Sequence, residues 1–133
     1  MKRKKAREEV VKLVYQMNML SDANEVLDVY VTLNNVKEND LAYIEGTVKG
    51  VEEHLEEIDA KISSNLKNWT IDRISQVSLA AMRVAVYEML YTEDVPTSVA
   101  ISEAVQIVTG YDDPDNASFV NGVLGSISRE EGR

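Results

Sequence analysis

Cysteine is absent from the sequence, and histidine occurs only once, as His54. Without cysteine there is no disulfide scaffold, no thiolate nucleophile and no cysteine ligand for zinc or an iron–sulfur cluster. A lone histidine argues against a histidine-rich metal centre and against a conventional hydrolytic triad. The acidic run from Glu52 to Glu57 resembles a solvated helix face, because neither a histidine pair nor a glycine loop lies beside it. We therefore expect no catalytic residue, no metal site and no cofactor, and a protein that is not an enzyme.

Long hydrophobic runs are also absent. No apolar stretch approaches the ~18–20 residues that a membrane-spanning helix needs, and the basic N-terminus leads into an amphipathic segment rather than a signal-peptide core. The composition is 44% hydrophobic and 28% charged, which is typical of a globular protein. A chain of 133 residues suffices for one ordinary domain and is too short for two. We expect a single cytoplasmic domain over residues 1–133 that does not associate with a membrane.

Basic residues are few outside the N-terminus. The net charge of the chain is −9, yet residues 1–12 carry a net charge of +4, because they contain six cations and only two acidic residues, Glu8 and Glu9. The rest of the chain holds 8 basic side chains (14 less 6) and 21 acidic ones (23 less 2). We call residues 1–7 the basic arm; its cations are Lys2, Arg3, Lys4, Lys5 and Arg7. An acidic protein with such an arm can bind a polyanion, but only locally.

The apolar residues recur three and four positions apart along nearly the whole chain, which predicts helices, and no segment alternates as a strand would. A capping box formed by Asp22 and Glu25 predicts the start of the second helix. The expected helices cover residues 4–20, Asp22 to Leu33, Asn39 or Asp40 to near Trp69, Ser78 to a stop at residues 94–96, Thr97 or Ser98 to a stop at Gly110, and Asp115 or Asn116 to beyond Ile127, with a short turn from Thr70 to Ile74. This pattern predicts an all-α domain of six to seven helices.

Tyr15 is the informative residue of the first predicted helix. At about 100° per residue it falls opposite the apolar stripe, on the same face as Lys4, Lys5 and Lys12. A tyrosine among lysines suits single-stranded RNA, because the charges hold phosphates while the ring stacks on a base. The same pattern fits a tyrosine that covers a neighbouring helix, with the lysines merely solvated. The sequence leaves both interpretations open.

Two glycines, Gly46 and Gly50, lie in the longest predicted helix opposite its apolar stripe. Together they cost roughly 2 kcal/mol of helix propensity, a cost that the close approach of another helix would offset. We expect that contact inside the domain, although a contact across a homodimer fits the same pattern. His54, at the edge of this face, is expected to be a partly buried packing residue.

The last predicted helix carries a side of small and polar residues, namely Ser118, Asn121, Gly122 and Gly125. Such a side lets a backbone or a nucleotide come close. Asparagine has little propensity reason to occupy a helix interior, so Asn121 is a candidate for RNA contact. Asp115, at the start of this helix, can accept hydrogen bonds from bases or simply from its own helix amides.

Segments along nearly the whole chain resemble the NusB family. In chain order they are Ala6-Arg7-Glu8, Val14-Tyr15-Gln16, Gly50-Val51 with His54 and Ile58-Asp59, Trp69 with Arg73, Arg83 to Glu88, Asp94-Val95-Pro96, Val99 to Val105, and Phe119 to Leu124. Each motif is modest alone, but their order and coverage make the resemblance specific.

The resemblance implies an all-helical fold of two packed helical bundles and a non-enzymatic role. Family members pair with NusE, a small-subunit ribosomal protein, and the pair binds boxA RNA to support antitermination, notably in ribosomal RNA transcription with other Nus factors. By the family's motifs, the RNA contacts correspond to Lys2, Arg3, Lys4, Lys5, Arg7, Tyr15, Asp115, Phe119 and Asn121. The surface that faces the protein partner corresponds to Gln76, Ser78, Leu79 and Met82.

This sequence departs from the family at several positions. Ser118 stands where members often carry lysine, and the arm is rich in lysine where many members use arginine, which favours diffuse phosphate attraction over planar bidentate bonds. Two alternatives remain: a helical protein-interaction module without useful RNA binding, and a NusB-like module that serves an rRNA methyltransferase. The absence of a cofactor-binding region disfavours the second. A homodimer of the free protein stays open.

Overall fold

The computed structural model describes residues 1–17 and 21–133. Within these residues the chain forms helices and no strand, which confirms the all-α prediction. The elements are α1 (Arg3–Met17), α2 (Ala23–Leu33), α3 (Glu38–Glu53), α4 (Leu55–Ser64), the 3-10 turn η1 (Ile71–Arg73), α5 (Gln76–Tyr91), α6 (Thr97–Tyr111) and α7 (Pro114–Glu131). The predicted end of the first helix, at Leu20, lies outside the described residues.

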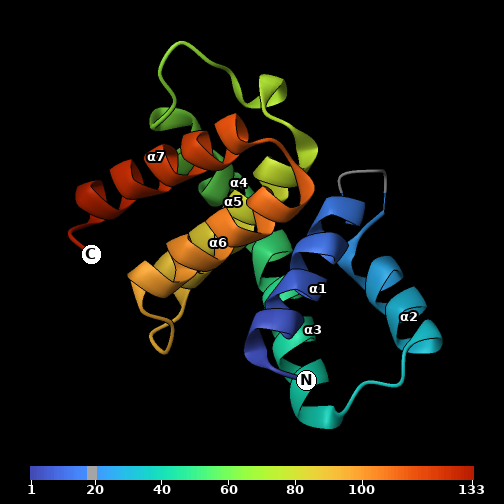
Figure 1. The fold of residues 1–133 in the computed structure, drawn as a ribbon. Coiled ribbons are helices and arrows are strands. Elements are labelled where there is room, and N and C mark those ends of the chain that lie inside the picture. Colours follow the sequence, from blue (N-terminus) through green and yellow to red (C-terminus); the bar gives the residue numbers. More distant parts are fainter. Residues whose placement is uncertain (18–20) are drawn as a thin grey trace.

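The helices form two packed groups that share α5. Figure 1 shows α1, α2 and α3 on one side of the molecule and α4, α6 and α7 on the other, with both termini at the surface. Helix α5 packs against α1, α3, α4, α6 and α7. Its residues from Ser78 to Val86 are all buried. They are apolar or small, as an enclosed helix requires, except Arg83, whose Nε and Nη2 donate to Asp59 at 2.8 and 2.7 Å. The prediction of two helical bundles is confirmed.

Helix caps explain why some predicted boundaries were wrong by a few residues. The predicted cap of α2 is confirmed, since the Asp22 carboxylate accepts from the Glu25 N–H at 2.9 Å. Helix α5 begins before Ser78, because the Ser75 hydroxyl oxygen accepts from the Ser78 N–H at 3.1 Å. Likewise Asp113 caps α7, and Pro114 occupies the first turn, where a missing N–H costs nothing.

The stop predicted at Gly110 was also wrong. Gly110 lies inside α6, which ends one residue later, at Tyr111. The following residue, Asp112, is extended, with a φ of −140°, so no left-handed glycine is needed to leave this helix.

The long helix predicted to run from Asn39 or Asp40 to near Trp69 is two helices. It begins at Glu38, breaks at His54, where φ is −105° and ψ is 17°, and ends at Ser64. The apolar stripe continues across the break, since Val51 and Ile58 are both fully buried. Periodicity therefore did not reveal the break. The His54 ring stacks on Tyr91 with centroids 3.9 Å apart, which confirms its expected packing role.

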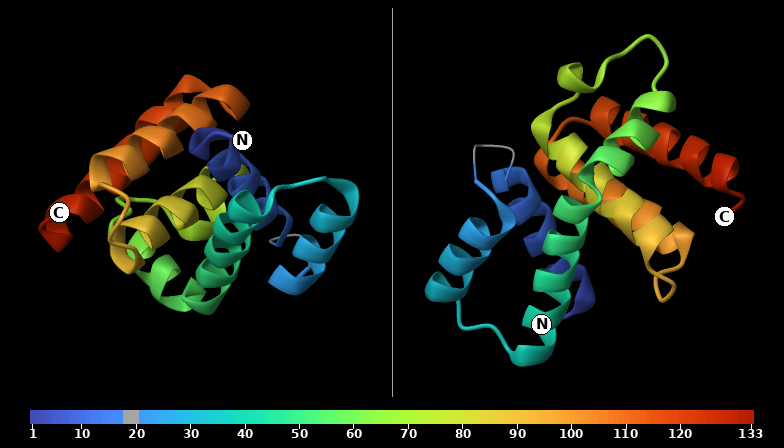
Figure 2. Two further views of the ribbon diagram at one scale, coloured as in Figure 1. Left: turned by 90° about the horizontal axis from the view of Figure 1, so that it is seen from below. Right: turned by 180° about the vertical axis from the view of Figure 1, so that it is seen from behind.

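The two glycines of α3 have different surroundings. At Gly50 a Cβ atom would lie 2.3 Å from the Tyr87 ring of α5, whereas at Gly46 it would meet no atom within 4 Å. The expected close approach inside the domain is confirmed for Gly50 and wrong for Gly46, which is exposed. Figure 2 shows α3 and α5 crossing from the opposite side.

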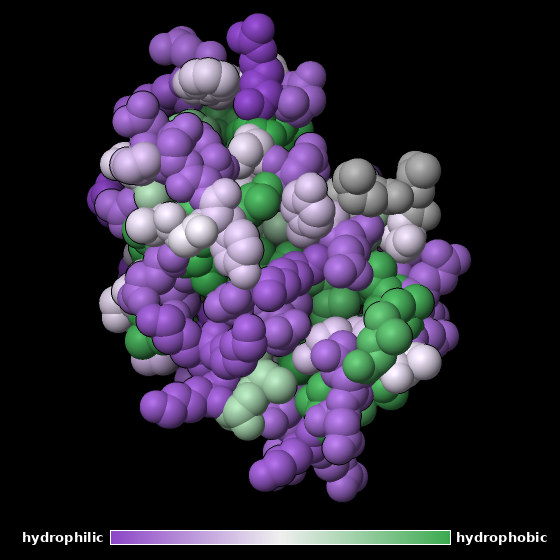
Figure 3. Space-filling model, turned by 45° about the vertical axis from the view of Figure 1, so that its right-hand side comes forward, coloured by the Kyte–Doolittle hydropathy of each residue, from purple (hydrophilic) through white to green (hydrophobic). Residues whose placement is uncertain are grey.

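Apolar side chains gather on the surface over α2, as Figure 3 shows. Among them Val29, Val31 and Leu33 are exposed, so α2 presents part of its apolar surface to solvent. None of the helices in the described residues is both long and apolar enough to cross a bilayer.

Candidate nucleic-acid interface

The basic arm forms the start of α1 and lies over α3 and α6. Residues 1–5 are exposed. The Arg3 guanidinium carbon lies 3.8 Å from the centroid of the Tyr43 ring, and the Lys4 ammonium donates to the side chain of Gln106. The Lys5 ammonium lies 3.3 Å from a carboxylate oxygen of Glu9. Such exposed pairs contribute little stability, so these cations can exchange their partners for phosphate at small cost.

Arg7 does not belong to this exposed set. It is buried, and its Nε and Nη2 donate to the two carboxylate oxygens of Glu88 at 2.7 and 3.2 Å. Its Nη1 also lies 3.5 Å from Glu103, and the Tyr43 hydroxyl donates to Glu88 at 2.9 Å. The prediction that Arg7 contacts RNA is therefore wrong for this structure, because the face of α1 that carries Arg7 is covered by α5 and α6.

Two groups of this buried cluster have shifted pKa values, Arg7 and Tyr43. Burial by itself lowers the pKa of Arg7, but the hydrogen bond and charge of Glu88 more than offset burial, and the pKa is raised overall. Burial and the Glu88 charge also raise the pKa of Tyr43, so this hydroxyl stays a donor. Arg7 thus fixes the end of the basic arm to the core, and leaves Lys2 to Lys5 as its exposed cations.

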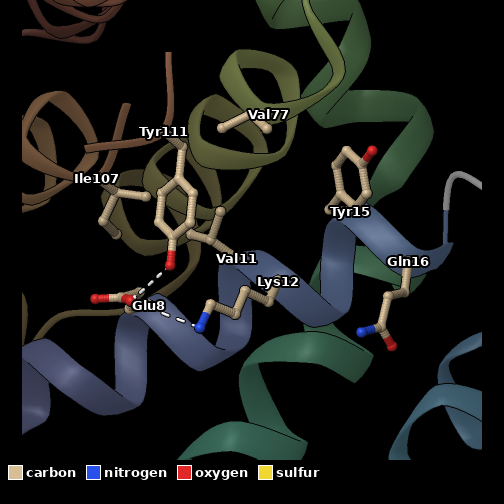
Figure 4. Close-up of a pocket in the computed structure, with 8 residues that line it drawn as sticks. All are labelled: Glu8, Val11, Lys12, Tyr15, Gln16, Val77, Ile107 and Tyr111. Atoms are coloured by element: carbon tan, nitrogen blue, oxygen red, sulfur yellow. Dashed lines mark hydrogen bonds and ion pairs between the residues drawn. The ribbon is translucent and has the colours of Figure 1, made fainter. Parts of the chain in front are cut away.

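Tyr15 is half-buried and lines a groove of about 340 Å³ between α1, α5 and α6. Figure 4 shows it at one end of this groove, with Tyr111 and Ile107 of α6 at the other. The remaining lining residues are Glu8, Val11, Lys12, Gln16 and Val77. The predicted position opposite the apolar stripe is thus covered in part by neighbouring helices. Whether the Tyr15 ring contacts RNA stays a prediction.

Charged groups close the other end of the groove. The Tyr111 hydroxyl donates to the Glu8 carboxylate at 2.8 Å, and the Lys12 ammonium lies 3.7 Å from that carboxylate. The hydrogen bond from Tyr111, helped by the charges of Lys5 and Lys12, lowers the pKa of Glu8. The groove therefore has an apolar floor and a rim of paired charges.

The four predicted partner residues do not share a surface. Gln76 is exposed at the start of α5, beside Val77 of the groove. Ser78, Leu79 and Met82 are 0%, 5% and 0% exposed, so they are core residues and cannot present their side chains to a partner in this conformation. The prediction for these three is corrected, because α5 is enclosed on all sides.

Ser78 shows why such a residue is buried. Its hydroxyl donates to the Asp112 carboxylate at 3.3 Å, and the Ser75 hydroxyl donates to the same carboxylate at 2.6 Å. These two bonds tie the start of α5 to the linker between α6 and α7. The hydrogen bond from Ser75, followed by those from Asn116 and Ser78, lowers the pKa of Asp112.

The start of α7 carries the second predicted RNA set. Asp115 and Asn121 are exposed, and Phe119 is half-buried, as expected for residues that face a ligand. Asp115 is not the helix cap, since the Asp113 carboxylate accepts from the Asn116 N–H at 3.0 Å. The Asp115 side chain is thus not needed for capping.

A second pocket, of about 350 Å³, opens beside these residues. Its walls include Trp69 and Arg73, from the segment between α4 and α5, as well as Asp115 and Phe119. Trp69 is 52% exposed, and its ring lies edge-on to Phe119, with centroids 6.2 Å apart and an interplanar angle of 63°. Trp69 was not proposed as a site residue from the sequence. The available signal was a tryptophan in a connecting segment, four residues before an arginine.

Helix α6 links the two RNA sets. The arm contacts α6 at Gln106 through Lys4, and Lys12 lies 5.8 Å from the ring of Tyr111 at the end of α6. Asp113, which caps α7, follows two residues after Tyr111. Helix α6 therefore contacts the arm and leads into the start of α7.

Among the described residues, no three histidine or acidic side chains cluster in a way that could hold a metal ion. The pockets are lined by aromatic, aliphatic and charged side chains that suit binding.

Comparisons with known proteins identify the family. The NusB family matches residues 4–129. The transcription antitermination protein NusB of Clostridium botulinum (strain Alaska E43 / Type E3) is 42% identical over 133 residues, which cover 98% of this chain and all of that protein. That of Acetivibrio thermocellus is 41% identical over 132 residues, covering 96% of this chain and 88% of that protein.

Solved structures match as well. T. maritima NusB superposes with a TM-score of 0.87 at 28% identity, over 98% of this chain and 92% of that one. A crystal structure of the antitermination factors NusB and NusE in complex with double-stranded RNA contains a chain with a TM-score of 0.87 at 28% identity, covering 96% of both chains. The chain described here therefore belongs to the NusB family of transcription antitermination factors, which are not enzymes.

Proposed function

We propose that this protein pairs with a NusE-type ribosomal protein and binds boxA-type single-stranded RNA, and that the pair supports ribosomal RNA transcription in the cytoplasm together with other Nus factors. The observation that carries the proposal is the placement of exposed cations, Lys2 to Lys5, and an aromatic pocket at opposite ends of one surface path along α6. The similar solved complex of NusB and NusE with double-stranded RNA supports pairing with a NusE-type protein and binding of RNA.

Charge restricts where RNA can bind. The chain carries a net charge of −9, and a polyanion is repelled by most of such a surface. The exposed lysines Lys2, Lys4 and Lys5 hold phosphates at the arm, while Phe119 offers a ring face and Asn121 an amide for bases. The contacts at the arm should then depend strongly on salt concentration, and the contacts at α7 should depend on the identity of the base.

The groove beside Tyr15 suits the protein partner. Its floor is apolar, formed by Val11, Val77 and Ile107, and a concave apolar site with a polar rim is typical of a pocket that takes an apolar side chain. Exposed Gln76 lies next to it and can bond a partner backbone. Because this groove also borders Tyr111, a partner bound there would lie beside the RNA path and could contact both.

Fluorescence anisotropy of a labelled boxA-type RNA, compared with a scrambled RNA, tests the proposal directly. Each RNA is titrated with this protein in the presence and absence of the NusE-type ribosomal protein. We expect tight, sequence-dependent binding only with the partner present. Weak binding that does not distinguish the two RNAs in either condition would contradict the proposal and favour a protein-interaction module that does not use RNA.

A further inference from the structure

We propose that Trp69 and Phe119 form a nucleobase pocket, with Asp115 on its rim as the acceptor that favours guanine over uracil. The inference rests on the proposed RNA-binding function and adds to it a residue, Trp69, and a base preference. It starts from Trp69, an aromatic ring that lines a pocket, contacts Phe119 and is still 52% exposed.

The geometry of the two rings suits stacking. The Trp69 ring is 52% exposed and meets Phe119 edge-on, at an interplanar angle of 63°. Phe119 therefore does not stack flat on the indole, and exposed ring surface remains beside the pocket of about 350 Å³ that both residues line. A flat base can stack on such a surface, and each base–aromatic stack contributes about 1–3 kcal/mol.

Hydrogen bonds hold the two walls in place without RNA. The Ser75 hydroxyl donates to Asp112 at 2.6 Å, which joins the segment that carries Trp69 to the linker that leads into α7. Figures 1 and 2 show the segment between α4 and α5 beside the first turn of α7. Because the pocket is formed before binding, little ordering of the protein opposes the entry of a base.

The charges around the pocket specify which part of RNA enters it. Asp113 and Asp115 line the pocket and repel phosphate, whereas they accept N–H groups. The Asp113 carboxylate already accepts from Asn116, but Asp115 is exposed and is not the helix cap. Arg73, which also lines the pocket, can hold the phosphate that follows the bound base.

Guanine matches Asp115 best. Its Watson–Crick edge offers two adjacent donors, N1–H and the N2 amino group, and a carboxylate accepts such a pair with both oxygens. Uracil offers a single N–H between two carbonyl oxygens, which face the carboxylate unfavourably. A good bidentate pair discriminates against the wrong base by about 1–3 kcal/mol, so the pocket should prefer guanine clearly.

The experiment uses Trp69 itself, because it is the single tryptophan of the chain. With the NusE-type partner present, a uridine nonamer with one central guanosine is compared with the all-uridine nonamer, and tryptophan emission and the anisotropy of a labelled end are followed together. The same titration with the Trp69→Ala variant gives the emission that does not come from Trp69. We expect emission to be quenched over the same concentrations that raise the anisotropy, with tighter binding of the guanosine-containing RNA. Trp69→Ala should weaken that binding about five- to hundred-fold, and D115N should reduce the preference for guanosine.

Leu33→Ala is the control, since Leu33 is an exposed apolar residue of α2 that lines neither the groove nor the pocket; it should leave the guanosine preference unchanged. Circular dichroism of each variant verifies that the helices are intact. If anisotropy shows RNA binding but Trp69 emission stays constant and Trp69→Ala binds as tightly as the parent, the pocket is wrong while the proposed function stands. If boxA-type RNA fails to bind even with the NusE-type partner, both the nucleobase pocket and the proposed function are wrong.

Discussion

The two regions expected to contact RNA, the basic arm and the first turns of α7, differ in almost every physical property. The arm exposes the cations Lys2 to Lys5 and is fixed to the core by one buried arginine, Arg7. The start of α7 is acidic, and it borders a pocket with two aromatic rings. Charge can therefore supply affinity at the arm, while shape and hydrogen bonding supply base recognition at α7.

The largest expected effect is on stability and belongs to the anchor of the arm. Arg7→Ala leaves Glu88, which is 1% exposed, as an uncompensated buried carboxylate, and breaking such a pair costs about 3–5 kcal/mol. Urea unfolding measures the decrease. Arg3→Ala is the control, because the exposed contact of Arg3 with Tyr43 contributes only about 0.5–1 kcal/mol. Equal decreases for the two variants would mean that the buried pair does not anchor the arm.

A smaller effect is expected at α7, and on RNA binding. Phe119→Ala removes one of the two rings of the pocket and should cost about 1–3 kcal/mol of RNA-binding free energy. The salt dependence of binding should stay as it was, because the cations that hold phosphate are unchanged. Anisotropy titrations at several salt concentrations measure both quantities. The exposed neighbour Ser118 provides the control S118A, which should bind like the parent; a changed salt slope in Phe119→Ala would argue against the division of roles.

Substitutions in the basic arm, unlike Phe119→Ala, should change the salt dependence of RNA binding. The double variant K4A/K5A should weaken binding to all RNAs alike and reduce the slope of log K against log salt by about 0.7 for each phosphate that the arm no longer neutralises. The control K37A/K49A removes the same charge from positions elsewhere on the chain. If both double variants lower the slope equally, phosphate attraction is spread over the surface and the arm has no special role.

The smallest effect concerns acid stability near α7. The pKa of Asp112 is lowered, first by the hydrogen bond from Ser75, so its ionised form stabilises the fold above the unfolded pKa of about 4. That contribution disappears as the pH falls below about 4, through the lowered folded pKa. Asp112→Asn should therefore lose about 1 kcal/mol at neutral pH and show a shallower decline of thermal stability in acid. An equal decline of thermal stability in acid for the variant and the parent would mean that ionised Asp112 does not stabilise the fold.

Much of this molecule could be predicted from local sequence. Helix periods and the cap at Asp22 depend on residues three or four positions apart, and the all-α fold and the exposed cations followed from them. The family resemblance pointed to Phe119 and Asn121, which lie half-buried and exposed at α7 as a contact site requires.

Other features depended on contacts between distant segments. Arg7 looked like one more cation of the arm, and only its pairing with Glu88, 81 positions later, made it part of the core. Ser78, Leu79 and Met82 looked like one face of a helix, but the helices packed around this stretch bury all three.

The sequence by itself determined the helices, the charge of the arm and the class of protein, because these depend on residues that are close along the chain. Only the tertiary structure decided which of the charged and aromatic residues reach the surface, and which of them meet there. Trp69 and Phe119 are 50 positions apart, and no local period relates them. The free energy that brings them together comes from packing α5 and α7 into one core.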